Sequence, residues 1–227
     1  MDLQKYLEII EDDKKQSFSS FKELLLNCNK EFNLTAICDE KGVLYKHFLD
    51  SLAGESLFSD GCSAIEIGSG AGFPSIPLKI LREDIKFTLI ESTGKKCTFL
   101  NRAVESLNLK CVQVVNNRAE ECAKNPYLRE KYDIACARAV ARLNTLCEYC
   151  LPFVKVGGSF VAYKSDDGEE IAEAENAICV LGGRLEKVID YELPESMGKR
   201  KLVVIKKVKP TPQKYPRGLG KERKNPL

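Results

Sequence analysis

The chain has 227 residues, 44% of them hydrophobic and 30% charged, with a net charge of +2, the composition of a globular protein that can bury a sizeable core. It has no apolar run of the roughly 18 residues that a membrane-spanning helix needs, and Met1–Tyr6 lacks the features of a secretion signal. We therefore expect a cytoplasmic monomer without a membrane partner.

The first part of the chain predicts helices. Apolar residues recur at helical spacing over residues 3–10, 18–28 and 43–58, the last of which includes His47, the only histidine. We expect His47 to be a hydrogen-bonded structural group and not a base. Because these helices precede the first strand, we assign residues 1–60 to a helical extension that forms a lid over the ligand.

The segment Ala64–Phe73 is the central motif. Its first four residues are apolar, apart from a glutamate, and predict a buried parallel strand. Gly68, Gly70 and Gly72 follow, where the lack of Cβ lets the backbone turn tightly and approach a ligand. A helix is predicted from about Pro74, so the unit resembles the start of a nucleotide-binding sheet. A glycine-rich turn without a ligand is the alternative.

The spacing of these glycines narrows the choice of ligand. The fingerprint of pyrophosphate-bearing dinucleotides is G-x-G-x-x-G, whereas this chain has G-x-G-x-G followed by the bulky Phe73. The next predicted strand, Phe87–Glu91, ends in a carboxylate at about the offset that serves ribose hydroxyls. A ligand with an adenosine ribose and no phosphate fits best, which points to S-adenosylmethionine.

The rest of the chain alternates predicted strands and helices. Further strands are expected at 111–115, 132–137, 159–163, 184–193 and 201–208, and helices at 94–107, 143–151 and 169–181. The last two strands form an antiparallel hairpin. The sequence thus predicts an α/β fold of the class I S-adenosylmethionine-dependent methyltransferase type: a Rossmann-like, mostly parallel seven-stranded sheet over residues 61–210.

Residues 138–141 after the fourth strand bear on the methyl acceptor. They read Arg-Ala-Val-Ala, without the acidic or amide residue and Pro-Pro-aromatic sequence typical of enzymes that methylate exocyclic amines. No cysteine adjoins a proline, as pyrimidine carbon-5 methylation commonly requires, and no aspartate ends this strand as in ribose methylation. The N7 atom of guanine has a free lone pair and needs no general base. The absence of these catalytic residues is therefore consistent with methylation at N7.

The charge is unevenly distributed. Residues 199–227 hold eleven lysines and arginines and one acid, Glu222, so this end carries +10 and the remainder −8. Such asymmetry is typical of a segment that binds a polyanion; a solubilising tail without a partner is the alternative. We expect the tail, residues 211–227, to be extended and to order only on docking or on binding RNA.

Ten cysteines raise the question of a zinc site. They are scattered, apart from Cys147 and Cys150, and the four ligands of a structural zinc cannot be assembled. We expect buried thiols in a reducing compartment and no metal.

Together these residues resemble the bacterial 16S ribosomal RNA guanine-N7 methyltransferases, the glucose-inhibited division protein B family. The resemblance covers nearly the whole chain. It rests on Asn33-Leu34-Thr35 and on residues 47–52, 68–74, 118–120, 137–139, 201–205 and 214–217.

The resemblance implies methylation of one guanine of 16S ribosomal RNA with S-adenosylmethionine as cofactor. By matching positions, cofactor contacts fall on Gly68, Phe73, Ala119, Glu120 and Arg138, and the chemistry of the turn adds Gly70, Gly72 and Glu91. We assign catalytic roles to Arg138 and to Arg200, which matches an arginine that the family needs and would contact RNA phosphate or guanine. The loop 164–168 is more acidic than the resemblance implies, which puts a substrate role for Lys164 in doubt.

Two other functions stay open. A small-molecule methyltransferase with this fold would leave the basic end unexplained. An RNA-binding or ribosome-assembly factor with a vestigial cofactor site would not be an enzyme.

Overall fold

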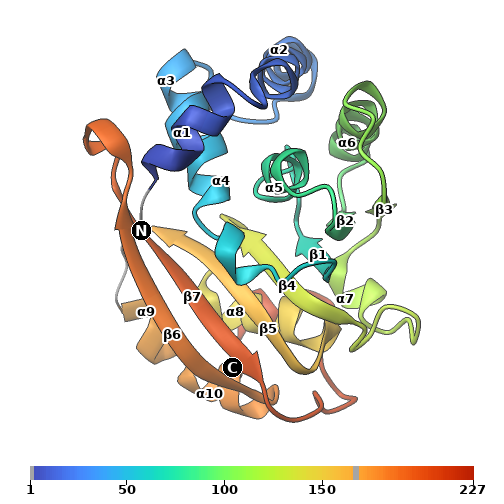
Figure 1. The fold of residues 1–227 in the computed structure, drawn as a ribbon. Coiled ribbons are helices and arrows are strands. Elements are labelled where there is room, and N and C mark those ends of the chain that lie inside the picture. The colour runs from blue at the N-terminus through green and yellow to red at the C-terminus, as the bar shows by residue number, and fades with distance from the viewer. Residues whose placement is uncertain (1–2, 166–168) are drawn as a thin grey trace.

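The computed structural model describes residues 3–165 and 169–227, so Asp166–Gly168 of the acidic loop lie outside it. A seven-stranded sheet in the order β3-β2-β1-β4-β5-β7-β6 forms its centre (Figure 1). The strands are β1 (Ser63–Ile67), β2 (Lys86–Glu91), β3 (Val112–Asn116), β4 (Tyr132–Arg138), β5 (Val154–Ser165), β6 (Gly183–Glu192) and β7 (Lys199–Lys207). The first five are parallel and β7 is antiparallel to both its neighbours, which confirms the predicted sheet and hairpin.

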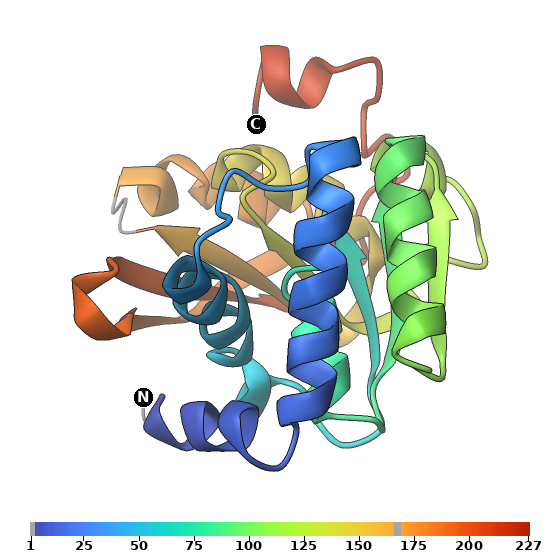
Figure 2. The ribbon, with the colours of Figure 1, turned by 90° about the horizontal axis from the view of Figure 1, so that it is seen from above.

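Helices cover both faces of the sheet, and the apolar core divides accordingly into two clusters. One face carries α1 (Gln4–Glu11), α2 (Lys15–Phe32), α5 (Ser75–Leu81) and α6 (Gly94–Ser106). The other carries α7 (Ala119–Cys122), α8 (Leu143–Cys150), α9 (Glu169–Glu173) and α10 (Glu175–Val180), the last two occupying the single helix predicted at 169–181. Figure 2 shows α2 and α6 side by side across the first face. No helix of the described residues is long and apolar enough to cross a bilayer.

The helix predicted at 43–58 is divided. After α3 (Glu40–Gly42) come a π-helix, η1 (Val43–Leu49), α4 (Asp50–Leu52) and a 3-10 turn, η2 (Glu55–Leu57). The wider π-turn leaves backbone groups available to other partners, and the carbonyl oxygen of Lys46 accepts a hydrogen bond from Arg138. Helical spacing predicts both kinds of helix, so the sequence pattern could not distinguish them.

The tail folds back beside α8 and ends in a short helix at the edge of the molecule (Figure 2, red). Thr211 and Tyr215 are buried, and a short helix, α11 (Lys221–Lys224), follows. The buried Lys207 ammonium donates to the Thr211 hydroxyl at 2.6 Å, and the Arg129 guanidinium donates to the Tyr215 carbonyl at 2.9 Å. The tail is thus ordered by docking on the body, one of the two expected means of ordering, whereas its short helix α11 was not expected because composition does not reveal the buried partners.

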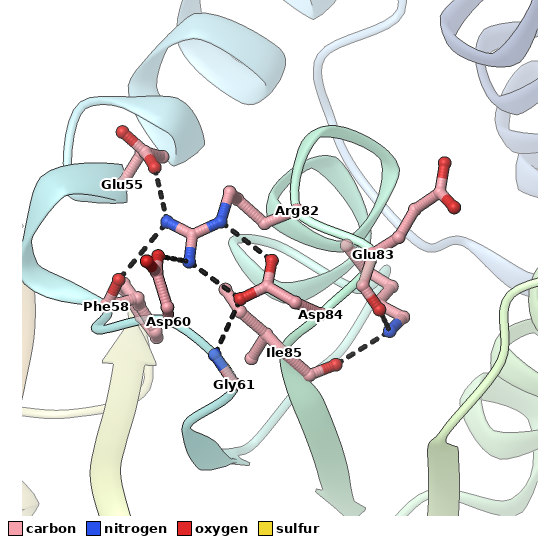
Figure 3. Close-up of polar contacts among 9 residues, drawn as sticks. Glu55, Phe58, Asp60, Gly61, Arg82, Glu83, Asp84 and Ile85 are labelled. Carbon is pink, nitrogen blue, oxygen red and sulfur yellow. Dashed lines mark hydrogen bonds and ion pairs between the residues drawn. The ribbon is translucent and has the colours of Figure 1, made fainter.

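An arginine cluster joins the N-terminal extension to the sheet (Figure 3). Arg82, just after α5, donates to the carboxylates of Glu55, Asp60 and Asp84 at 2.7–2.8 Å, and to the Phe58 carbonyl. The hydroxyl of Tyr6 on α1 donates to Glu55 at 3.2 Å. The cluster therefore links α1, the segment after η2 and the end of α5.

We expect Arg82→Ala to lower the free energy of unfolding by about 1–3 kcal/mol, because several carboxylates lose a shared partner whose side chain is only 18% exposed. Urea denaturation followed by circular dichroism measures the loss. The control is Lys22→Ala, which breaks one exposed pair with Glu40 and should cost at most about 0.5 kcal/mol. Equal losses in the two variants would contradict a structural role for the cluster.

Candidate functional site

The glycine turn lies where the strand order reverses, between β1 and β4, which is where ligands bind in open α/β sheets. Gly68, Gly70 and Gly72 all have positive φ, at 70°, 56° and 82°. A Cβ atom on Gly68 would lie 2.7 Å from the Val140 side chain, and one on Gly72 would lie 2.4 Å from Ile76. The glycines therefore let the turn pack closely on the segment after β4 and on α5.

A cavity of about 320 Å³, the first cleft, opens at the carboxyl ends of β1, β2 and β3. Three of the predicted cofactor residues line it: Gly68, Ala119 and Glu120. Asn117 and Arg118, which the sequence places at this edge of the sheet together with Ala119 and Glu120, line it as well. The sequence did not single out the other lining residues, which are Ile67, Ile90, Ser92, Val140, Tyr149, Gly220 and Arg223. The last two come from the tail, which thus forms part of the wall.

Glu91 is buried behind the turn and does not itself line the first cleft, although its neighbours Ile90 and Ser92 do. Its carboxylate accepts hydrogen bonds from the backbone N–H of Gly70 at 3.0 Å and of Thr93 at 2.8 Å. A carboxylate offers about four acceptor positions, so Glu91 retains capacity for further donors. In this structure it holds the glycine turn against the end of β2.

The Phe73 side chain points away from the first cleft. Its ring is 6% exposed and packs 4.4 Å from the ring of His47 and 5.5 Å from that of Phe21, measured between centroids. The structure therefore places Phe73 in the aromatic contact between the glycine turn, α2 and η1. Gly70 and Gly72 also lie outside the lining of the cleft.

A second cavity, of about 270 Å³, lies beyond the ends of β4 and β5, and we call it the second cleft. It brings together Arg138 and Arg200, the two predicted catalytic residues, from β4 and β7. Lys164 also lines it, but its ammonium pairs with Glu170 and donates to the Ala141 carbonyl. The remaining lining residues are Ile37, Lys46, His47, Asp50, Ala139, Tyr163 and Ser165.

Asp50 lies at the centre of the second cleft and is 4% exposed. One carboxylate oxygen accepts from Arg138 at 2.9 Å, and the other accepts from the Tyr191 hydroxyl at 2.7 Å. The Nε atom of Arg200 lies 3.7 Å from that second oxygen. From the sequence, Asp50 of the 47–52 motif is open to a local capping or pairing role; the structure instead pairs it with residues of β4 and β6.

His47 is held between two partners. Its Nε2 lies 2.8 Å from the Thr35 hydroxyl, and its Nδ1 lies 3.1 Å from an Nη2 of Arg138. Because guanidinium is only a donor, Nδ1 accepts and the proton of the neutral ring is on Nε2. Burial, with the charge of Arg138, lowers the pKa of His47 to about 3. The prediction of a hydrogen-bonded structural histidine is confirmed.

Glu66 on β1 is a residue that the sequence reasoning missed. It is fully buried; one carboxylate oxygen accepts from the Ser75 backbone N–H at 3.3 Å, and the other has no hydrogen-bond partner within the described residues. Burial raises the pKa of Glu66 to about 8, so it carries a proton at neutral pH. A charged residue inside an otherwise apolar strand, two positions before the first glycine, was the available signal.

The residues that the structure describes contain no group of three or more histidine, cysteine, aspartate or glutamate side chains that could hold a metal ion. The ten cysteines are free thiols, seven of them buried. Burial raises the pKa of Cys147, one half of the C-x-x-C pair, above its ordinary value.

Comparison with known proteins gives a family and a fold. The family model for rRNA small subunit methyltransferase G matches residues 14–202. The chain is 46% identical to "Ribosomal RNA small subunit methyltransferase G" of Acetivibrio thermocellus over 219 residues, 96% of this chain and 90% of the relative. It is 44% identical to the protein of the same name from Lactobacillus acidophilus over 233 residues, 100% and 97% of the two chains.

Solved structures share the fold at low sequence identity. An O-methyltransferase from Bacillus cereus in complex with SAH is 18% identical, with a TM-score of 0.57 over 82% of this chain and 91% of that one. A SAM-dependent methyltransferase from Aquifex aeolicus is 18% identical, with a TM-score of 0.55 over 74% and 93%. The predicted methyltransferase fold is confirmed.

The lowered pKa of His47 predicts a pH-dependent stability. Its folded-state pKa lies below its unfolded value of 6.5, so the folded state binds fewer protons and is destabilised as the pH falls from about 6.5 toward 3. Between pH 7 and pH 5 the wild type should lose about 2 kcal/mol more of unfolding free energy than His47→Gln, which has no titrating ring. Urea denaturation at the two pH values measures the difference, and equal losses would contradict the neutral, buried ring.

Proposed function

The chain belongs to the rRNA small subunit methyltransferase G family, and from this premise we propose that it transfers a methyl group from S-adenosylmethionine to N7 of a single guanine in 16S ribosomal RNA. The observation that carries the proposal is the placement of two clefts beside one short segment. Val140 lines the first cleft and Ala139 lines the second. A cofactor in one cleft and an acceptor base in the other would meet across this segment.

The first cleft fits the cofactor. Gly68 presents backbone without a side chain, and Glu120 is a buried acceptor at the wall. Glu91 retains acceptor positions suited to ribose hydroxyls. When bound, S-adenosylmethionine supplies a methyl group on a positively charged sulfur. The chain's part is to hold and orient this group and to exclude water.

The second cleft fits an acceptor that needs no deprotonation. Asp50 is bound to Arg138 and Tyr191, His47 is bound on both nitrogens, and Lys164 is paired with Glu170. No described residue of this cleft is therefore placed as a free general base. Guanine N7 attacks through a lone pair that is already available, so positioning alone can accelerate its methylation.

Arg138 and Arg200 have different roles in positioning the reacting groups. Arg138 already donates to Asp50, the Lys46 carbonyl and His47, which fixes its guanidinium and leaves two of its five N–H groups. Arg200 donates to the Lys199 carbonyl and lies at a longer distance from Asp50, so most of its donors are available. We assign Arg138 to orientation of the reacting groups and Arg200 to the guanine or an RNA phosphate.

We extend the proposal to the arrangement of the chain. Residues 1–60 act as a lid on the second cleft, since Ile37, Lys46, His47 and Asp50 line it. We also propose that the protein is a monomer that acts in the cytoplasm, where ribosomal RNA is processed. Size-exclusion chromatography with light scattering tests the oligomeric state.

We expect transfer of labelled methyl from S-adenosylmethionine to small ribosomal subunits that lack this modification. Chemical cleavage at N7-methylguanine should then map one site in 16S RNA, present in cells with the protein and absent from cells without it. Cofactor binding without label in RNA would favour a small-molecule acceptor. RNA binding without cofactor binding in calorimetry would favour an assembly factor.

Two variants should separate RNA use from cofactor binding. Arg200→Ala should raise KM for small subunits about tenfold with little change in cofactor Kd, because a charge-assisted contact of about 1.4 kcal/mol is lost. Glu91→Ala should weaken cofactor binding about tenfold, because the turn loses its anchor. The exposed neighbour Lys199→Ala is the matched control for Arg200. A normal KM in Arg200→Ala would remove the assignment.

A further inference from the structure

We propose that Arg118 and Arg223 together bind a phosphate group of the RNA strand at the mouth of the first cleft. This inference rests on the proposed function. It adds, to the RNA contacts proposed for the second cleft, a separate contact at the first cleft. This contact depends on the packed tail, which carries Arg223. The two arginines come from distant parts of the chain, the loop after β3 and the helix α11, and both line the first cleft.

Buried contacts fix the position of Arg223. Arg217 forms a bidentate pair with the buried Glu148 on α8, with the shortest contact at 2.7 Å. Glu222 is fully buried; its carboxylate accepts from the Gly218 backbone N–H, and its carbonyl accepts from the Thr145 hydroxyl at 3.0 Å. These contacts hold α11 on α8, and this packing places Arg223 at the first cleft.

Neither arginine has a carboxylate partner among residues 3–165 and 169–227, and both are exposed. Other arginines among the described residues pair with carboxylates, including Arg82, Arg102, Arg138, Arg142, Arg200 and Arg217. The first cleft thus has two guanidinium groups against one lining carboxylate, that of Glu120, and this excess of positive charge favours the binding of an anion.

The cofactor does not supply that anion at this end. S-adenosylmethionine has no phosphate, and its one anionic group, the methionine carboxylate, is outweighed by its own ammonium and sulfonium charges, so the cofactor as a whole brings no net negative charge to two cations. An RNA strand carries a phosphate at every nucleotide, and guanidinium binds phosphate with two parallel hydrogen bonds. The chemistry of the pair therefore fits the RNA substrate.

The location suits a strand that reaches the second cleft. An Nη2 of Arg223 lies 3.5 Å from the carbonyl oxygen of Val140, the residue next to Ala139 of the second cleft. A guanine placed in the second cleft brings its sugar–phosphate backbone past this segment. The phosphate pair would hold the strand while the base occupies the second cleft.

The test compares Arg118→Ala, Arg223→Ala and the double variant with Lys86→Ala, which removes an exposed cation from the amino-terminal end of β2. Binding of a fluorescently labelled single-stranded RNA is measured by anisotropy over a range of salt concentrations. Binding of S-adenosylhomocysteine is measured by calorimetry on the same proteins. Both assays are independent of methyl transfer, so they test the phosphate pair even if the proposed reaction fails.

Each single variant should weaken RNA binding about tenfold and reduce the slope of log K against log salt by about 1, whereas Lys86→Ala should change neither. Cofactor affinity should stay within about twofold of wild type in all variants. RNA binding and slopes equal to those of Lys86→Ala would overturn the inference. A loss of cofactor affinity with unchanged RNA binding would also overturn it and assign the arginines to the cofactor.

Discussion

The ion pair between Asp50 and Arg138 is the interaction on which the second cleft depends. It joins the N-terminal extension to the carboxyl end of β4, with both side chains largely buried. A buried pair is costly to desolvate, and it is retained only where further hydrogen bonds satisfy its remaining groups. Here Tyr191, His47 and the Lys46 carbonyl supply them. The π-helix η1 contributes two of these partners, so its departure from regular geometry has a local function.

The same network explains why the extension and the sheet form one site. Phe73 of the glycine turn packs on His47, and the guanidinium of Arg138 lies 4.9 Å from the centroid of the Phe73 ring. The turn that shapes the first cleft is thus in direct contact with the group that organises the second. A displacement of η1 would therefore alter the packing at both clefts.

The C-terminal segment has two distinct properties, a positive charge and a packed position on the body. Composition reveals only the charge. The segment's cations give this end of the chain an electrostatic attraction for polyanions, as the charge distribution indicates. Its buried residues fix it on α8 and on the loop that holds Arg129 and Glu130, so it forms a wall of the first cleft. The cations are therefore presented at defined positions, and a fixed cation binds a phosphate with less loss of side-chain entropy than a mobile one.

The sequence by itself determined the strands, their alternation with helices, the glycine turn and the family, because each depends on local periodicity or on a contiguous motif. It also placed Ala119, Glu120, Arg138 and Arg200 near the clefts. Only the tertiary structure decided that Phe73 points away from the first cleft, that Asp50 organises the second and that the tail is packed. Ion pairs, burial and the direction of a side chain depend on residues that are distant in sequence and a few ångströms apart in space, and no local pattern records those distances.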